Sequence, residues 1–166
     1  MRAICPGSFD PVTFGHLDII GRTAAMFDEV VVAVGHNMSK SGLFLPEERV
    51  EMIEQCTSDL PGVSATLFSG LLVDFCAEQG IGAIAKGLRF GADFDYELQM
   101  AQMNGHLTGV ETIFLPTAPQ WSFVSSSLVR EVAQLGGDVS ALVPPLVVDR
   151  VRSRLAERAG EKGENQ

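Results

Sequence analysis

Short apolar runs alternate along this chain with longer segments in which apolar residues recur every three or four positions. Runs of the first kind are typical of strands buried on both faces of a sheet, and segments of the second kind are typical of helices that bury one face. The runs predict strands at residues 2–5, 29–35, 63–68, 81–85 and 112–115. The periodic segments predict helices that start at residues 17 and 46, and helices at 71–78, 92–107, 126–135 and 145–157.

This alternation of strand and helix predicts the fold class. A strand, a helix and a second parallel strand connect by a right-handed crossover, and repeated crossovers leave helices on both faces of the sheet. We therefore expect a single-domain α/β protein with a doubly wound, five-stranded parallel sheet over residues 1–158 and a flexible C-terminal tail at 159–166. Ligands bind at the carboxyl ends of the strands in such sheets. One rim should therefore gather the loops at 6–16, 35–44, 68–72, 86–91 and 116–127.

The composition of the chain disfavours a nucleic-acid binder and a membrane protein. The 166 residues carry a formal net charge of −9, which disfavours a general nucleic-acid binder because such proteins need a basic face. No apolar run approaches the roughly 18 residues of a membrane span, and the N-terminus lacks the apolar core of a signal peptide. Cys5, Cys56 and Cys76 are odd in number and lack C-x-x-C spacing, so we expect reduced thiols in a cytoplasmic protein.

The tetrapeptide Thr13-Phe14-Gly15-His16 stands between the first predicted strand and the first predicted helix. This position places His16 at a helix N-terminus, where unpaired backbone N–H groups and the positive end of the helix dipole favour bound phosphate. An imidazole there can donate a hydrogen bond to a phosphoryl oxygen, and Gly15 lets the backbone approach the ligand. The competing interpretation is a capped turn with an idle surface histidine.

Two cations follow the fourth predicted strand in the sequence Lys86-Gly87-Leu88-Arg89. In an acidic chain, a lysine point charge beside an arginine fork favours recognition of a polyphosphate. The alternative is a surface turn with solvated charges. Lys40, in the loop at 39–42, is a weaker candidate because exposed lysines in loops commonly bind nothing specific.

The segment at 121–130, WSFVSSSLVR, leads into the fifth predicted helix. Ser125, Ser126 and Ser127 would offer hydroxyls and free backbone N–H groups to an anion at the helix start. Trp121 and Phe123 would either wall a purine ring or pack the loop. Helix capping alone explains one serine but does not readily explain three.

The motifs do not favour other chemistry. The serines lack the spaced histidine and acid of hydrolases, and the cysteines occur in apolar segments, so we expect no covalent intermediate. The chain has neither a G-x-x-x-x-G-K-[ST] loop nor a G-x-G-x-x-G fingerprint. Asp93, Asp95 and Glu97 could ligate a metal, but acids in a first helical turn more often complement the helix dipole. We assign no metal ligand.

Five motifs, GSFD at 7–10, TFGH at 13–16, KGLR at 86–89, DFDYE at 93–97 and VSSS at 124–127, together closely resemble those of the phosphopantetheine adenylyltransferase family. The likeness covers residues 1–157. The T-x-G-H and serine-rich motifs are shared by the wider nucleotidyltransferase superfamily, whereas the run from Lys86 through Asn104 narrows the match to this family. The resemblance implies a Rossmann-like nucleotidyltransferase fold.

The resemblance also implies the reaction. Members of the family combine ATP with 4′-phosphopantetheine in coenzyme A biosynthesis, and the products are dephospho-coenzyme A and pyrophosphate. The implied mechanism is direct in-line attack without a covalent enzyme intermediate, with Mg²⁺ assisting. A homohexamer and feedback inhibition by coenzyme A are implied as well.

Family roles transfer to the matching positions of this chain. The resemblance makes His16, Lys40 and Arg89 catalytic, with His16 stabilising charge on the α-phosphate. It implies ATP contacts from Ser8, Phe9, His16, Gly87, Leu88, Arg89, Glu97, Trp121, Ser122, Phe123, Val124, Ser125, Ser126 and Ser127. It implies phosphopantetheine contacts from Ser8, Lys40, Leu72, Lys86, Met103 and Asn104. Two positions depart from the family pattern: Lys86 stands where arginine is frequent, and Ser8 replaces a frequent threonine.

Two other functions are compatible with the motifs. One is another small nucleotidyltransferase of the same fold, with nicotinate mononucleotide or a glycerol phosphate as the acceptor. The other is a nucleotide-sensing module that keeps the phosphate-binding rim without turnover. Pyrophosphate release with several acceptors distinguishes the first, and tight ATP binding without pyrophosphate formation would indicate the second.

Overall fold

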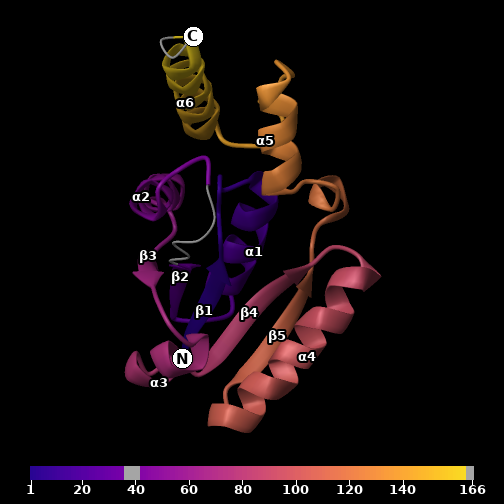
Figure 1. The fold of residues 1–166 in the computed structure, drawn as a ribbon. Helices are drawn as coiled ribbons and strands as arrows, with labels where there is room; N and C mark the ends of the chain where they lie inside the picture. The colour runs from indigo at the N-terminus through magenta and orange to yellow at the C-terminus, as the bar shows by residue number, and fades with distance from the viewer. Residues whose placement is uncertain (36–41, 164–166) are drawn as a thin grey trace.

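Five parallel strands form one sheet with the order β3-β2-β1-β4-β5 in the computed structural model, which describes residues 1–35 and 42–163 (Figure 1). The strands are β1 (Arg2–Gly7), β2 (Glu29–Gly35), β3 (Val63–Phe68), β4 (Ala83–Leu88) and β5 (Glu111–Pro116). The helices are α1 (Phe14–Ala24), α2 (Pro46–Cys56), α3 (Leu72–Glu78), α4 (Gly91–Thr108), the 3-10 helix η1 (Pro119–Trp121), α5 (Ser126–Gln134) and α6 (Pro145–Gly163). The predicted α/β fold with a doubly wound, five-stranded parallel sheet is confirmed.

Alternating side chains of the strands enter two separate apolar layers. Cys5 of β1 and Val32 of β2 join the larger layer, to which α1, α2, α5 and α6 contribute. Ile4 and Val31, one position earlier in each strand, join the smaller layer with Val73 of α3. Both faces of β1 and β2 are therefore covered, which explains why these strands are apolar at almost every position.

The central strands β1 and β4 separate toward their carboxyl ends. Their pairing ends at Ile4↔Ile84, whereas β1 pairs with β2 up to Gly7↔Val34 and β4 pairs with β5 up to Leu88↔Pro116. Figure 1 shows β4 and β5 leaning away from β1. These two strands are also the point where the strand order reverses, and doubly wound sheets bind ligands in the crevice at that point.

Three element boundaries differ from the sequence prediction by three residues or more. Helix α1 begins at Phe14, so His16 lies inside its first turn and does not precede it. Strand β4 runs through Leu88 because its backbone continues to pair with β5, so Lys86 and Gly87 are strand residues. Helix α6 continues to Gly163, into the segment assigned to the tail, whose flexibility stays a prediction. None of the helices in the described ranges is long and apolar enough to cross a membrane.

Charged side chains from α2 and α6 hold the backbone of the segment at 42–45, which leads into α2. Arg158 and Arg154 of α6 donate to the carbonyl oxygens of Gly42 and Leu43 at 2.6 and 2.8 Å. Glu48 of α2 accepts the N–H of Leu45 at 2.7 Å. The long C-terminal helix therefore fixes a segment on the carboxyl side of the sheet.

Candidate active site

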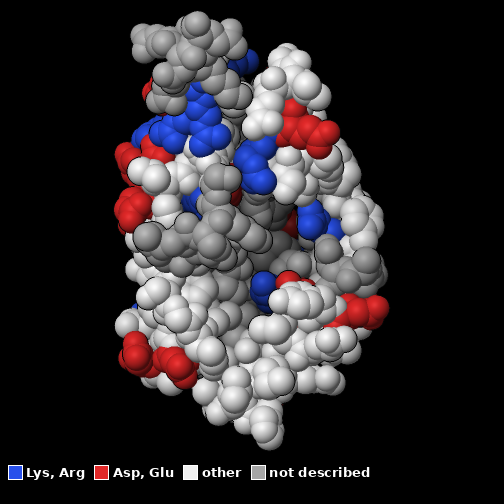
Figure 2. All heavy atoms as spheres, viewed as in Figure 1, with Lys and Arg blue, Asp and Glu red and all other residues white. Residues whose placement is uncertain are grey.

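A cleft of about 620 Å³ opens where β1 and β4 separate. Its walls come from the carboxyl ends of both strands, from the start of α1, from α4 and from the start of α5. Figure 2 shows blue basic side chains bordering the hollow on the face in view. A cleft with this lining suits an anionic ligand, although the chain as a whole is acidic.

A capping box fixes the orientation of His16. The Thr13 hydroxyl accepts the His16 backbone N–H at 3.3 Å, and His16 Nδ1 accepts the Thr13 backbone N–H at 3.0 Å. Phe9 packs against the imidazole with its ring centroid 4.9 Å away and the rings inclined at 66°. Because a backbone N–H can only donate, Nδ1 is the acceptor and the ring proton resides on Nε2.

The environment keeps the His16 imidazole neutral. Burial lowers the pKa of His16 from 6.5 to about 4, and the nearby positive charge of Arg89 adds to this decrease. At neutral pH the ring therefore carries one proton, on Nε2, and lines the cleft as a hydrogen-bond donor without a formal charge. A donor of this kind stabilises negative charge that develops on a phosphoryl oxygen and does not need to transfer a proton.

This lowered pKa predicts a loss of stability at mildly acidic pH. The unfolded chain takes up a proton on His16 below about pH 6.5, whereas the folded chain resists protonation down to about pH 4. The free energy of unfolding should therefore fall by about 1.5 kcal/mol between pH 6.5 and 5 through this group. Urea denaturation should show this loss in the wild type and in the exposed-site control His106→Gln, but not in His16→Gln. Equal pH dependence in all three proteins would contradict the assignment.

The three serines at the start of α5 have different partners. Ser125 is the N-cap, and its hydroxyl accepts the Leu128 N–H at 3.1 Å. Ser126 donates to the carbonyl oxygen of Pro11 at 2.8 Å and so ties α5 to the loop before α1. The N–H groups of Ser126 and Ser127 belong to the first turn and have no intrahelical acceptor. The serines therefore present a helix N-terminus to the cleft, which all three line.

Lys86, near the end of β4, and Arg89, just after it, both line the cleft. Lys86 Nζ lies 3.3 Å from Oε1 of Glu97 on α4. Arg89 Nη1 donates to the carbonyl oxygen of Val124 at 3.3 Å, which links the end of β4 to the segment before α5. The two predicted cations are therefore held at the same cleft as His16.

A second, smaller cavity of about 150 Å³ shares Lys86 and Glu97 with the main cleft. Leu72 of α3, Met100 and the buried Asn104 of α4 contribute to its lining. An elongated ligand with a phosphate near Lys86 could therefore extend from the cleft into an apolar space that contains one amide.

The structure brings most of the predicted site residues together. The main cleft is lined by Ser8, Phe9, His16, Lys86, Gly87, Arg89, Glu97, Val124, Ser125, Ser126 and Ser127, and the smaller cavity by Lys86, Glu97, Leu72 and Asn104. Lys40 lies outside the described residues.

Five predicted contact residues line neither cavity: Leu88, Trp121, Ser122, Phe123 and Met103. Trp121 packs on Phe14 with ring centroids 5.1 Å apart, as the loop-packing alternative expects, and its contact with ATP stays a prediction. The Ser122 hydroxyl donates to Pro119, and Phe123 is 58% exposed. Met103 is likewise exposed, and Met100, one helical turn earlier, occupies the cavity wall.

Sequence reasoning missed three charged residues that line the cleft: Asp10, Arg49 and Arg130. Arg49 lies on the face of α2 that buries Met52 and Ile53. An arginine at a helical spacing from buried apolar residues is a signal that the sequence did contain, because buried arginines require a paired anion. Asp10, within the GSFD motif, is that anion at 3.4 Å.

The close approach of these charges at Gly42 allows a stability prediction. A Cβ at Gly42 would overlap Nη2 of Arg49 and lie 2.8 Å from Oδ2 of Asp10. Gly42→Ala should therefore lower the free energy of unfolding by about 1–3 kcal/mol, the usual cost of overpacking. The control Gly21→Ala, whose Cβ would meet nothing within 4 Å inside α1, should raise it by about 0.5–1 kcal/mol. Urea denaturation measures both, and an unchanged Gly42→Ala protein would contradict the described packing.

This chain is similar to known proteins over most of its length. Residues 4–132 match the cytidylyltransferase-like family. A phosphopantetheine adenylyltransferase from a Nocardioides species is 65% identical over 155 residues, 93% of this chain and 98% of that protein. A phosphopantetheine adenylyltransferase from Streptomyces coelicolor is 59% identical over 157 residues, 95% of this chain and 99% of that protein.

A solved structure, the lipopolysaccharide core biosynthesis protein from Thermoplasma volcanium, shares the fold with a TM-score of 0.54 at 19% identity, over 71% of this chain and 96% of that chain. The fold is that of a Rossmann-like nucleotidyltransferase. The chain belongs to the cytidylyltransferase-like family and, within it, to the phosphopantetheine adenylyltransferases.

Proposed function

We propose that this protein transfers the adenylyl group of ATP to 4′-phosphopantetheine, giving dephospho-coenzyme A and pyrophosphate. The observation that carries the proposal is the convergence at one cleft of the His16 imidazole, the α5 N-terminus and the cations Lys86 and Arg89. The two relatives named for this activity, at 65% and 59% identity over nearly the whole chain, support the same substrates.

The geometry suits direct attack. ATP would lie in the main cleft with its α-phosphate near Nε2 of His16 and its further phosphates near the α5 N-terminus and Arg89. The acceptor phosphate would lie near Lys86, with the pantetheine arm in the cavity beside Asn104. An oxygen of the acceptor phosphate forms a bond to the α-phosphorus as the bond to the bridging oxygen breaks, and pyrophosphate leaves with that electron pair. Such a reaction depends on orientation and charge stabilisation.

A covalent route finds little support among the described side chains. Burial raises the pKa of the Cys5 thiol, the cysteine that lines the cleft, to about 11. Its thiolate would therefore be scarce at neutral pH. The Ser125 and Ser126 hydroxyls serve as a helix cap and as a tether to Pro11, without a base in the roles that hydrolases use.

We infer that Mg²⁺ enters with the nucleotide, where it neutralises phosphate charge. Among the described residues no group of three or more histidine, cysteine, aspartate or glutamate side chains could hold a metal ion. The carboxylates that line the cleft are engaged, Asp10 by Arg49 and Glu97 by Lys86. This arrangement fits an ion held mainly by substrate phosphates and water, as is usual for Mg²⁺.

We further propose a cytoplasmic homohexamer that is inhibited by coenzyme A. The free cysteines Cys5, Cys56 and Cys76 support a reducing compartment. Exposed apolar side chains on α4, among them Tyr96 and Leu107, would be buried in a subunit interface. Coenzyme A contains the whole of dephospho-coenzyme A and could therefore occupy both cavities at once. Light scattering of the purified protein and inhibition of turnover by coenzyme A test these two points.

Pyrophosphate release by the purified protein with ATP and Mg²⁺ tests the proposed reaction. Release should require 4′-phosphopantetheine and should be absent with pantetheine, which lacks the attacking phosphate. Nicotinate mononucleotide and glycerol 3-phosphate serve as further acceptors. Turnover with either of these but not with 4′-phosphopantetheine would assign another reaction, and tight ATP binding without any pyrophosphate would indicate a binding module.

A further inference from the structure

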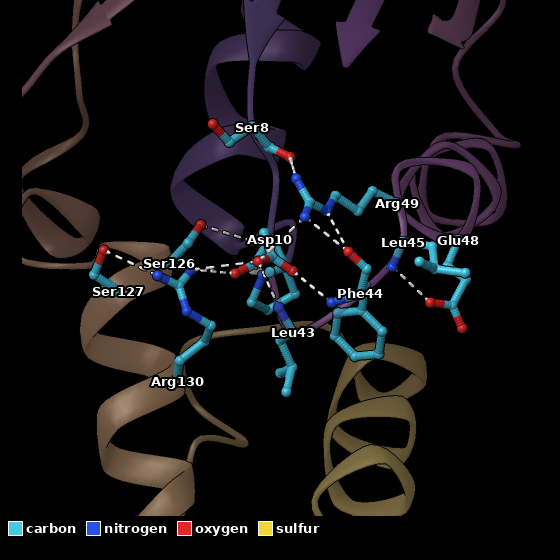
Figure 3. Close-up of polar contacts among 12 residues, drawn as sticks. Ser8, Asp10, Leu43, Phe44, Leu45, Glu48, Arg49, Ser126, Ser127 and Arg130 are labelled. Carbon is cyan, nitrogen blue, oxygen red and sulfur yellow. Dashed lines mark hydrogen bonds and ion pairs between the residues drawn. The ribbon is translucent and has the colours of Figure 1, made fainter. Parts of the chain in front are cut away.

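Asp10 lies between two arginines at the wall of the cleft (Figure 3). Its Oδ2 accepts the Leu43 N–H at 2.8 Å, and its Oδ1 accepts the Phe44 N–H at 2.9 Å. The same Oδ2 lies 3.4 Å from Nη2 of Arg49 and 3.8 Å from Nη1 of Arg130. The Asp10 side chain is only 6% exposed. One buried carboxylate therefore joins the loop before α1, the segment before α2, α2 itself and α5.

The two arginines differ in how their donors are used. Arg49 donates from Nε and Nη2 to the Phe44 carbonyl oxygen at 2.9 and 2.7 Å, and from Nη1 to the Ser8 carbonyl oxygen at 3.2 Å. Its side chain is 10% exposed, so Arg49 serves the protein interior. Arg130 is 31% exposed. It donates from Nη1 to the Asp10 carbonyl oxygen, and its Nη2 lies 3.5 Å from the Ser127 hydroxyl.

The charge balance of this cluster leaves one positive charge at the cleft. Asp10 offsets one of the two guanidinium groups, and the other, on the more exposed Arg130, stands beside the N-terminus of α5. Without the carboxylate, Arg130 would lose its ion-pair partner and keep only the Asp10 carbonyl oxygen and the Ser127 hydroxyl as contacts. While Arg49 is present, the two guanidinium groups would also repel each other. The long Arg130 side chain would then leave the α5 N-terminus for other rotamers.

We propose that Asp10 is a positioning residue for nucleotide binding, because it holds the Arg130 guanidinium beside the α5 N-terminus, facing the triphosphate. The inference rests on the proposed function only in taking a nucleoside triphosphate as the ligand. Although Asp10 lines the cleft, its side chain is only 6% exposed, and its two carboxylate oxygens are engaged by the N–H groups of Leu43 and Phe44 and by the two arginines. It therefore acts through Arg130 and not by contact with ATP.

A cycle of variants in the full chain tests this coupling, with the Kd for MgATP in the absence of acceptor as the readout. Arg130→Gln should raise the Kd at least tenfold, since hydrogen bonds to charged groups contribute substantially. Asp10→Asn combined with Arg49→Gln removes the buried anion and its buried cation together, and should raise the Kd by a similar factor. In this double variant the Arg130 guanidinium is no longer held beside the α5 N-terminus. Adding Arg130→Gln should therefore change the Kd less than threefold.

A further tenfold rise in the Kd when Arg130→Gln is added to the double variant would overturn the proposal, because the substitutions would then act independently. Unchanged affinity in the folded double variant would overturn it as well. Asp10→Asn alone provides a second background. The cycle is measured in a background that unfolds cooperatively in urea, since such a variant is folded. The matched control Arg150→Gln, whose ion pair with Glu51 lies on the α2–α6 surface, should leave the Kd unchanged. Because binding is measured without turnover, failure here is distinguishable from failure of the proposed reaction, which would appear as absent pyrophosphate in the wild type.

Discussion

Replacement of His16 by alanine is expected to lower kcat for pyrophosphate release by about 10²- to 10³-fold, while the affinity for ATP stays within several-fold of wild type. The capping box directs the proton-bearing Nε2 toward the cleft, where charge develops on the α-phosphate during transfer. Loss of one such donor typically costs about 2.7–4 kcal/mol in the transition state. Steady-state kinetics gives kcat, and calorimetry with MgATP gives the affinity.

The matched control for this variant is His106→Ala, because His106 is exposed near the end of α4 and lines neither cavity. Its kcat should equal that of the wild type. A kcat within threefold of wild type for His16→Ala would show that the imidazole does not stabilise the transition state. A large loss of ATP affinity at unchanged kcat would make His16 a ground-state binding residue.

Replacement of Lys86 by alanine is expected chiefly to weaken the binding of 4′-phosphopantetheine, with a KM increase of roughly 10- to 100-fold. Lys86 is shared by the main cleft and the smaller cavity, so its ammonium is placed where an acceptor phosphate would lie between the two. Its removal also leaves Glu97 without its ion-pair partner at 3.3 Å, and this carboxylate would repel the phosphate. KM values for both substrates measure the effect.

Lys86→Arg is the informative control, because arginine is frequent at this position in the family pattern. A guanidinium can pair with both Glu97 and a phosphate, so the KM for 4′-phosphopantetheine should stay within several-fold of wild type. If Lys86→Ala instead abolished ATP binding and left the acceptor KM unchanged, the two substrate positions in the site would have to be exchanged.

The layers of the fold could be predicted because they depend on local patterns. The β-branched run in β2 is buried from Val30 to Val34, and such runs mark strands covered on both faces. The extent of β4 could not be predicted in the same way. Lys86 and Gly87 interrupt the apolar run, yet the backbone pairs them with Phe114 and Leu115 of β5, and this pairing comes from a distant part of the chain.

Helix phase limited the prediction of the second cavity. Met100 and Met103 are three residues apart on α4, so they are neighbours on the helix surface. Only the way α4 docks on β4 and β5 decides that Met100 lines the cavity while Met103 is exposed. The role of Trp121 also depends on tertiary packing, because contact with a purine ring and packing of the loop are both compatible with its position before α5.

The cluster around Asp10 illustrates what motifs alone leave out. Asp10, Arg49 and Arg130 come from three distant parts of the chain and meet only when α2 and α5 dock beside the loop that precedes α1. Sequence motifs placed the groups that would contact substrate, such as His16, whereas the charges that hold those groups in place depend on tertiary packing.

A crystal structure with a non-hydrolysable ATP analogue and Mg²⁺ tests the central claim most directly, which is that the imidazole, the cations and the α5 N-terminus surround one triphosphate. We predict that an α-phosphate oxygen lies within hydrogen-bond distance, about 3 Å, of His16 Nε2, with the remaining phosphates at the N–H groups of Ser126 and Ser127. A triphosphate bound elsewhere, or with its α-phosphate out of reach of His16, would contradict the account.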